Sequence, residues 1–104
     1  MSDPVTFINA IDVDPSKQQE LIDILNEGTE QVIGKRPGFI SVTILASADK
    51  SRVVNIARWE SADDVIATQA DPTAAEYAKR TAAIAQADPR LYTIVGQFFG
   101  RAER

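Results

Sequence analysis

The chain has 104 residues, of which 44% are hydrophobic and 25% are charged, and its formal net charge is −4. These proportions are typical of one soluble globular domain, which we assign to residues 1–104, and they exclude a disordered, collagen-like or coiled-coil chain. The sequence contains no cysteine and no histidine. Disulfides, thiolate nucleophiles, Ser-His catalysis and the commonest metal and haem ligand are therefore excluded.

Charge and hydropathy also restrict the partners. An acidic chain lacks the positive surface that binds nucleic acid, and no apolar run approaches the roughly 20 residues that cross a bilayer. The segment Met1–Pro4 has no basic stretch followed by an apolar one, so we expect no secretory signal. We therefore predict a cytoplasmic protein without nucleic-acid or membrane partners.

The first half of the chain predicts a strand, a helix and a hairpin. Its opening segment is rich in β-branched and aromatic residues, which is typical of a strand. Asp14 and Pro15 then suit the cap and the first turn of a helix, where proline needs no N–H, and Gly34 indicates the helix end. The polar stretch 47–51 predicts the hairpin turn. We expect strands at 4–13, 39–46 and 52–60 and a helix at 15–33.

The second half predicts two helical pieces and a last strand. Ser61 suits a helix cap, with Asp64 three residues later as a short capping box. Asp71 and Pro72 repeat the signal of a cap followed by proline, and Pro89 indicates the end of the helix. We expect the second helical piece at 72–87 and the last strand at 91–99.

This order of elements predicts an α+β fold of the ferredoxin-like βαββαβ type, with an antiparallel sheet. Both faces of the sheet carry apolar rows, but two helices cover only one face. We therefore expect a homodimer in which a second copy covers the other face, to which we assign Ile40, Val42 and Ile44. The alternative is a sheet that exposes some apolar side chains to water.

Large rings fill a core between sheet and helices well, so we place Phe7 and Trp59 on the helix-covered face. Asn9 and Asn55 then point into the same space. Because buried amides need hydrogen-bond partners, two of them beside the only tryptophan indicate a site for a polar aromatic ligand. The alternatives are amides that bond to the local backbone and a tryptophan that only packs in the core.

The second helical piece carries Tyr77 and Thr81 one turn apart among several alanines. Short alanine side chains either leave a cavity against the sheet or pack tightly, and both interpretations stay open. Lys79 and Arg80 are interpreted as solvated charges. The same interpretation applies to the acidic stripe of the first helix, Glu20, Asp23, Glu27 and Glu30.

The order of the elements, the turn Arg36-Pro37-Gly38-Phe39 and the strand end Ala57-Arg58-Trp59-Glu60-Ser61 resemble the antibiotic biosynthesis monooxygenases, over about residues 5 to 99. The resemblance implies a dimeric α+β barrel that oxidises aromatic polyketides without metal, flavin or haem. It implies pocket positions for Trp59 and Asn55. It also places Asn9 at an asparagine of the haem-degrading branch, and Tyr77 near the axial histidine of that branch. Because this chain has no histidine, that haem ligation cannot occur.

Taken with what this resemblance implies, we predict a homodimeric, cofactor-independent monooxygenase that oxidises a phenol, quinol or anthrone-type substrate with O2. The two amides would hold the substrate oxygen as charge develops, Trp59 would stack on the ring, and Tyr77 would position the substrate or transfer a proton. The alternative is a dimer that binds a small aromatic or apolar ligand without reaction. We assign catalysis to Asn55, Trp59 and Tyr77, substrate binding to Asn9, Phe7 and Thr81, and no residue to a cofactor or metal.

Overall fold

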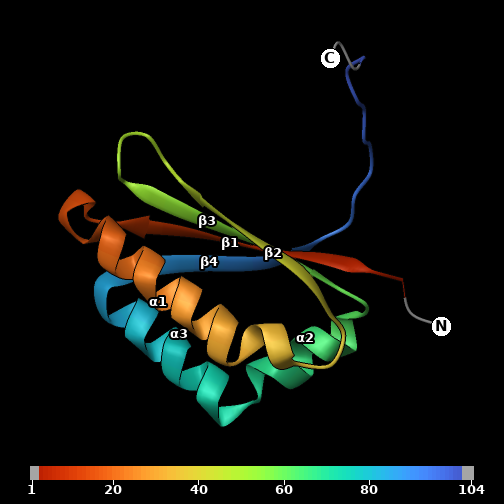
Figure 1. Cartoon of the computed structure of the whole chain (residues 1–104), viewed down its shortest axis with the longest axis horizontal. Coiled ribbons are helices and arrows are strands. Elements are labelled where there is room, and N and C mark those ends of the chain that lie inside the picture. The colour runs from red at the N-terminus through yellow and green to blue at the C-terminus, as the bar shows by residue number, and fades with distance from the viewer. Residues whose placement is uncertain (1–2, 102–104) are drawn as a thin grey trace.

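The computed structural model describes residues 3–101. Within that range the chain forms four strands and three α-helices, arranged in two layers (Figure 1). None of these helices has the length and apolar content needed to cross a membrane. The elements are β1 Val5–Val13, α1 Gln18–Gln31, β2 Phe39–Ala46, β3 Arg52–Trp59, α2 Ala62–Gln69, α3 Pro72–Ile84 and β4 Ala85–Tyr92.

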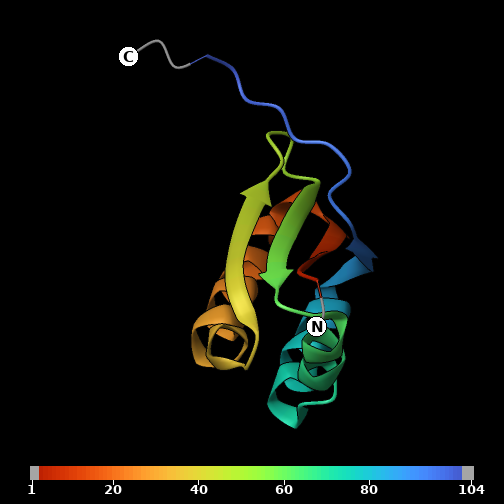
Figure 2. The same cartoon turned by 90° about the vertical axis from the view of Figure 1, so that its right-hand side faces the viewer.

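The four strands form one sheet in the order β2-β3-β1-β4, and every neighbouring pair is antiparallel. All three helices lie on the same side of the sheet, with α1 and α3 side by side beneath the strands (Figure 1). The segment after β4 leaves the end of the sheet and extends away from the helices (Figure 2). The predicted ferredoxin-like α+β fold is confirmed, and the two helical pieces predicted for the second half of the chain are present as α2 and α3.

The helix predicted at 15–33 is present, but α1 itself is shorter, at Gln18–Gln31, and the predicted cap acts on a 3₁₀ turn that precedes it. Asp14 Oδ1 accepts a hydrogen bond from the Ser16 N–H at 2.9 Å, and Pro15 begins a short 3₁₀ turn that leads into the α-helix. The apolar face of α1 buries Leu21, Ile24 and Gly28. Packing of this face against the sheet stabilises α1, because helices of this length are marginal in isolation.

The last strand lies earlier in the chain than predicted. α3 ends at Ile84 and β4 follows without a linker, so the predicted helix at 72–87 and strand at 91–99 are wrong in these bounds. Residues 85–87 favour a helix locally, but pairing with β1 overrides this preference. Pro89 lies inside β4, which is an edge strand and therefore tolerates a residue without an N–H.

A β-bulge changes the faces of β2. Phe39 opposes Trp59, but the next paired residue of β2 is Ser41, so one extra residue separates the two pairs. Val42 therefore lies on the helix-covered face, opposite Ala57, and packs against the cluster that contains Trp59. Ile44 shares this face. The assignment of Val42 and Ile44 to the uncovered face is wrong, because strict alternation does not anticipate an inserted residue.

Two buried clusters hold the helices on the sheet. One contains Ile11, Val13, Leu21 and Val53, and the other contains Ala57, Trp59 and Val65. Asn9 and Asn55 oppose each other across β1 and β3. On the same face of the sheet, the pair Phe7–Ala57 lies two residues away in one direction and the pair Ile11–Val53 two residues away in the other. The two amides therefore separate the apolar clusters in the middle of the covered face.

Gly38 shapes the turn that enters β2. Its φ of +84° lies in the left-handed region that favours glycine, and a Cβ at this position would overlap the Asp64 carboxylate in the first turn of α2. The Gly38 carbonyl accepts the Glu60 N–H at 2.8 Å. The turn brings Phe39 into an edge-to-face contact with Trp59, with ring centroids 5.7 Å apart.

We expect Gly38→Ala to lower the free energy of unfolding by about 1–3 kcal/mol, because an L-residue is strained in the left-handed region and its Cβ meets Asp64. Urea denaturation measures this loss. Gly96→Ala is the matched control, because a Cβ there would lie 3.4 Å from its nearest neighbour, an ordinary contact. Equal stability of the two variants would contradict the prediction.

Candidate functional site

A cavity of about 500 Å³ lies between the sheet and the three helices. Small-molecule sites typically have volumes of about 300–1,000 Å³. The lining is mainly apolar, with a few polar side chains that include Asn9, Asn55, Thr68 and Thr81. A shallower depression of about 680 Å³ near Asp12 is open to solvent and contains none of the predicted site residues.

All six residues predicted for the site line this cavity, although they come from three different elements. Phe7 and Asn9 belong to β1, Asn55 and Trp59 to β3, and Tyr77 and Thr81 to α3. The placement of Phe7 and Trp59 on the helix-covered face is therefore confirmed. The chemical roles of the six side chains stay predictions.

The amide oxygen of the Asn9 side chain is hydrogen-bonded to the backbone. Its Oδ1 accepts a hydrogen bond from the Asp88 N–H in β4 at 3.1 Å. Because the amide oxygen is fixed in this way, Nδ2 is the free donor of the side chain. The backbone partner that the sequence analysis left open is present, and the side chain lines the cavity as well.

Asn55 lies directly opposite Asn9. Its Oδ1 is closed off from solvent and has no hydrogen-bond partner within the described part of the chain. An unpaired buried acceptor costs about 1–3 kcal/mol, and folded proteins keep few of them. Since the oxygen is closed off, Nδ2 is the polar atom of Asn55 that a ligand in the cavity can reach.

Trp59 both packs and lines the cavity. Its side chain is only 3% exposed and contacts Phe39, Ala57 and Val65 in the core. The same residue belongs to the cavity wall. The packing alternative of the sequence analysis and the lining role are therefore compatible.

Tyr77 is held by charged residues on two helices. Its Oη donates to Glu27 Oε2 at 2.7 Å, and Arg80 Nη1 donates to the same oxygen at 3.2 Å. The Arg80 guanidinium lies 5.1 Å from the centroid of the Tyr77 ring. Glu27 and Arg80 are each about half exposed, but they form an ion pair rather than two separate solvated charges.

These contacts shift two pKa values in opposite directions. The hydrogen bond from Tyr77, followed by that from Arg80, lowers the pKa of Glu27, so this carboxylate is ionised at neutral pH. The hydrogen bond to Glu27 raises the pKa of Tyr77 above its ordinary value near 10. Tyr77 is therefore a weaker acid than a free tyrosine, and at neutral pH it is present even less often as the tyrosinate that a general base would require.

The alanines of α3 leave room against the sheet. Four of them, Ala74, Ala75, Ala78 and Ala82, line the cavity. Thr81 lies among them and is 6% exposed. Of the two interpretations of this alanine-rich helix, the structure supports the one with a cavity.

An ion pair beside the cavity was not anticipated. Arg36 Nη1 lies 3.3 Å from Asp71 Oδ2, and Arg36 Nε donates to Thr68 Oγ1 at 3.4 Å. Asp71 also caps α3 by accepting the N–H groups of Thr73 and Ala74. Since Thr68 lines the cavity, Arg36 joins the turn before β2 to the junction of α2 and α3.

Other lining residues were also missed. Ala87 and Pro89 line the cavity from β4, which the sequence analysis placed further along the chain. Lys79 belongs to the lining too, and it is exposed, in agreement with its interpretation as a solvated charge. The lining contains no carboxylate, and residues 3–101 contain no cluster of three or more acidic side chains that would suit a metal ion.

The chain is similar to a known family of enzymes. The family described as antibiotic biosynthesis monooxygenase matches residues 4–80. A curated relative, tetracenomycin-F1 monooxygenase of Streptomyces glaucescens, is 46% identical over 70 residues, which are 67% of this chain and 62% of the relative. The matched part is thus less than two thirds of the length of that relative.

Solved structures share the fold over nearly the whole chain. The ActVA-Orf6 monooxygenase of Streptomyces coelicolor, in complex with nanaomycin D, has a TM-score of 0.84 and 28% identity, and the match covers 95% of this chain and 94% of the other. SnoaB of Streptomyces nogalater, a cofactor-independent oxygenase studied as an asparagine-to-alanine variant, has a TM-score of 0.81 and 25% identity, with coverage of 92% and 97%.

The two asparagines should differ in what they contribute to stability. We expect Asn55→Leu to keep the free energy of unfolding or to raise it by up to about 1 kcal/mol, because the substitution removes an unpaired acceptor. Asn9→Leu should lower it by about 1 kcal/mol, because the Asp88 N–H loses its acceptor. Urea denaturation of both variants measures the difference, and equal losses would contradict it.

Proposed function

Because the chain belongs to the antibiotic biosynthesis monooxygenase family, we propose that it oxidises a small phenol, quinol or anthrone-type polyketide with O2, without metal, flavin or haem. The observation that carries this proposal is the cavity of about 500 Å³ lined by two amides from neighbouring strands and by a tryptophan. The similar structures support it, since one is of a cofactor-independent oxygenase and the other holds nanaomycin D. The cytoplasm stays the predicted location.

The proposed reaction needs only the substrate and O2. An anthrone loses a proton from its ring CH2 and becomes an electron-rich anion, which transfers electrons to O2. One oxygen atom becomes the new carbonyl oxygen and the other leaves as water, so that CH2 and O2 give C=O and H2O. The protein has to hold the planar ring, favour the anion and exclude bulk water.

The free amide groups suit the stabilisation of an anion. Nδ2 of Asn9 and Nδ2 of Asn55 would donate to the substrate oxygen as negative charge develops on it. Trp59 would stack on the ring, while Phe7 and Thr81 would enclose it. The mainly apolar wall strengthens these hydrogen bonds, because it lowers the local dielectric constant.

The cavity offers no obvious base for the substrate. Its lining contains no carboxylate, and the sequence contains no histidine. Tyr77, which we had predicted to position the substrate or transfer a proton, keeps its own proton in the hydrogen bond to Glu27. We therefore propose a positioning role for Tyr77, and a substrate acidic enough to give its proton to water.

Oxygen uptake tests the proposal. The purified protein is mixed with a dihydroxyanthrone in the presence of a metal chelator, without added flavin, and O2 consumption is followed with an electrode. We expect saturable uptake above the rate without protein and formation of the corresponding quinone. Saturable binding of the anthrone without such uptake would contradict the monooxygenase and favour the non-catalytic binding protein.

Substitution of the asparagines should reduce turnover. We expect Asn55→Ala to lower kcat by about 100-fold, the typical loss for one donor to a developing oxyanion. Asn9→Asp keeps an acceptor for the Asp88 N–H but replaces the free donor by an anionic oxygen, so it should lower kcat at least as much. Asn26→Ala is the control, because this exposed amide bonds only to the backbone of α1. Unchanged kcat in Asn55→Ala would remove Asn55 from the mechanism.

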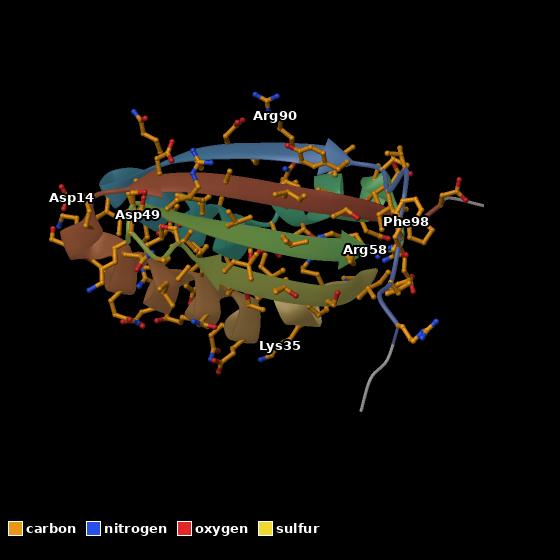
Figure 3. The ribbon with its side chains drawn as sticks, turned by 90° about the horizontal axis from the view of Figure 1, so that it is seen from above. Asp14, Lys35, Asp49, Arg58, Arg90 and Phe98 are labelled. Atoms are coloured by element: carbon orange, nitrogen blue, oxygen red, sulfur yellow. The ribbon has the colours of Figure 1, made fainter. Side chains whose placement is uncertain are left out.

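We also propose that the protein acts as a homodimer that packs through the uncovered sheet face. The register places Ile8, Val54 and Ile56 on this face, and Leu45, on the same face, is 49% exposed. Figure 3 looks onto the face, with Arg58 at one end of the strands and Arg90 at the β4 edge.

The segment after β4 adds to the apolar surface on this side of the molecule. Val95, Phe98 and Phe99 are 97%, 95% and 84% exposed, and Phe98 lies at the same end of the sheet as Arg58 (Figure 3). Exposed apolar side chains of this size are typical of protein interaction sites. A second copy of the chain would cover both the sheet face and this segment.

We expect Ile56→Asp to give a monomer, because the aspartate would place an unpaired charge in the centre of the proposed interface. Ile66→Asp is the matched control, since Ile66 is 60% exposed on α2, in the helical layer. Light scattering at micromolar concentration measures both masses. A dimeric Ile56→Asp protein, or a monomeric parent protein, would contradict the proposed interface.

A further inference from the structure

The wall of the cavity has a close contact at the point where α1 meets α3. Gly28 lies inside α1, where glycine is a poor helix former. A Cβ at this position would lie 3.1 Å from Cγ and 3.2 Å from Cδ1 of Tyr77. A side chain at residue 28 would therefore require the ring of Tyr77 to move away from the backbone of α1 by a few tenths of an ångström.

The other end of the Tyr77 side chain is fixed by Glu27. The Oη–Oε2 hydrogen bond of 2.7 Å ties α3 to α1, and Arg80 adds its bond to the same carboxylate and lies over the ring. The ring is thus held at its base by the contact with Gly28 and at its tip by Glu27. Both Gly28 and Tyr77 line the cavity.

We propose that Glu27 is a positioning residue that fixes the Tyr77 ring as a wall of the cavity, and that the Gly28–Tyr77 contact sets how broad a planar ring system the cavity accepts. The proposal deepens the proposed function, on which its substrate class rests. Tyr77 then acts through its ring and its fixed orientation, and its hydroxyl serves to bond Glu27 rather than to exchange a proton with the substrate.

Trp59 gives a binding assay that needs no turnover. It is the only tryptophan of the chain and it lines the cavity, so a bound planar quinone should quench its fluorescence. The probe is a hydroxyanthraquinone, which is already oxidised and cannot react further. The assay therefore separates the two proposals. Absence of O2 uptake contradicts the proposed oxygenase activity, whereas the affinities of the variants for the probe test the proposed role of Glu27 and Tyr77 in the cavity wall.

We expect Tyr77→Phe and Glu27→Ala each to weaken binding of the probe by about three- to tenfold, because either change removes the hydrogen bond that holds the ring. The double variant should bind the probe no more weakly than the single variant with the lower affinity, because all three variants lack the same Tyr77–Glu27 hydrogen bond. Glu27→Gln, which keeps an acceptor, should recover part of the affinity. Glu30→Ala, on the exposed side of the same helix, is the control and should bind like the parent.

Gly28→Ala tests the breadth of the cavity. The added Cβ displaces the Tyr77 ring, so binding of the three-ring anthraquinone should weaken more than that of a two-ring hydroxynaphthoquinone. Thermal melting followed by circular dichroism checks that each variant is folded. Equal losses for both probes would overturn the specificity role of Gly28.

Two results would overturn the role of Glu27. One is an unchanged affinity in Glu27→Ala, and the other is a double variant whose loss is the product of the two single losses. Kinetics add a third criterion. Substitution of a residue that only forms the wall should raise KM and leave kcat within about twofold of the parent value. A large fall of kcat in Tyr77→Phe, not matched in Glu27→Ala, would assign proton transfer to the hydroxyl instead.

Discussion

The pairing of Asn9 with Asn55 across β1 and β3 is the constraint on which the site depends. It places two amides in the middle of the only sheet face that the helices cover, between two apolar clusters. Amides do not fill a core as Leu or Val would, and they require partners. One finds a partner in the backbone of β4 and the other leaves its oxygen unpaired. A structure optimised for stability alone would place apolar side chains at both positions.

The helical layer keeps the space beside these amides open. Alanines on α3 reach only a short distance toward the sheet, so the layers are held apart by the clusters and by the Phe39–Trp59 contact at one end. Away from that contact, Tyr77 of α3 packs closely against Gly28 of α1 and fills the space between the two helices. Side-chain size, large at the ends and small in the middle, therefore produces a cavity within a chain of ordinary length and composition.

Local signals predicted most of the fold and failed where pairing between strands decides the outcome. The caps at Asp14 and Asp71 are chemical signals that act within a few residues, and both are present. The bulge after Phe39 and the strand around Pro89 depend on the register with β3 and β1, which no local pattern contains. The candidate site was predictable because alternation along β1 and β3 is unbroken. The hydrogen-bond partner of Tyr77 was not predictable from the sequence. Glu27 lies 50 residues away in the chain, and in the sequence it resembles the other acidic residues of the same helix.

The chemistry that this cavity favours follows from what its wall holds. Donors from two amides stabilise a negative charge without supplying or removing a proton, and they do so better in an apolar surrounding than in water. The wall carries no carboxylate that could take the proton of a weak acid, and Tyr77 is bound to Glu27. Under the proposed function, such a site would select substrates that ionise easily and whose anions are electron-rich enough to react with O2. Hydroxylated anthrones and quinols have both properties, whereas simple alcohols and alkanes have neither.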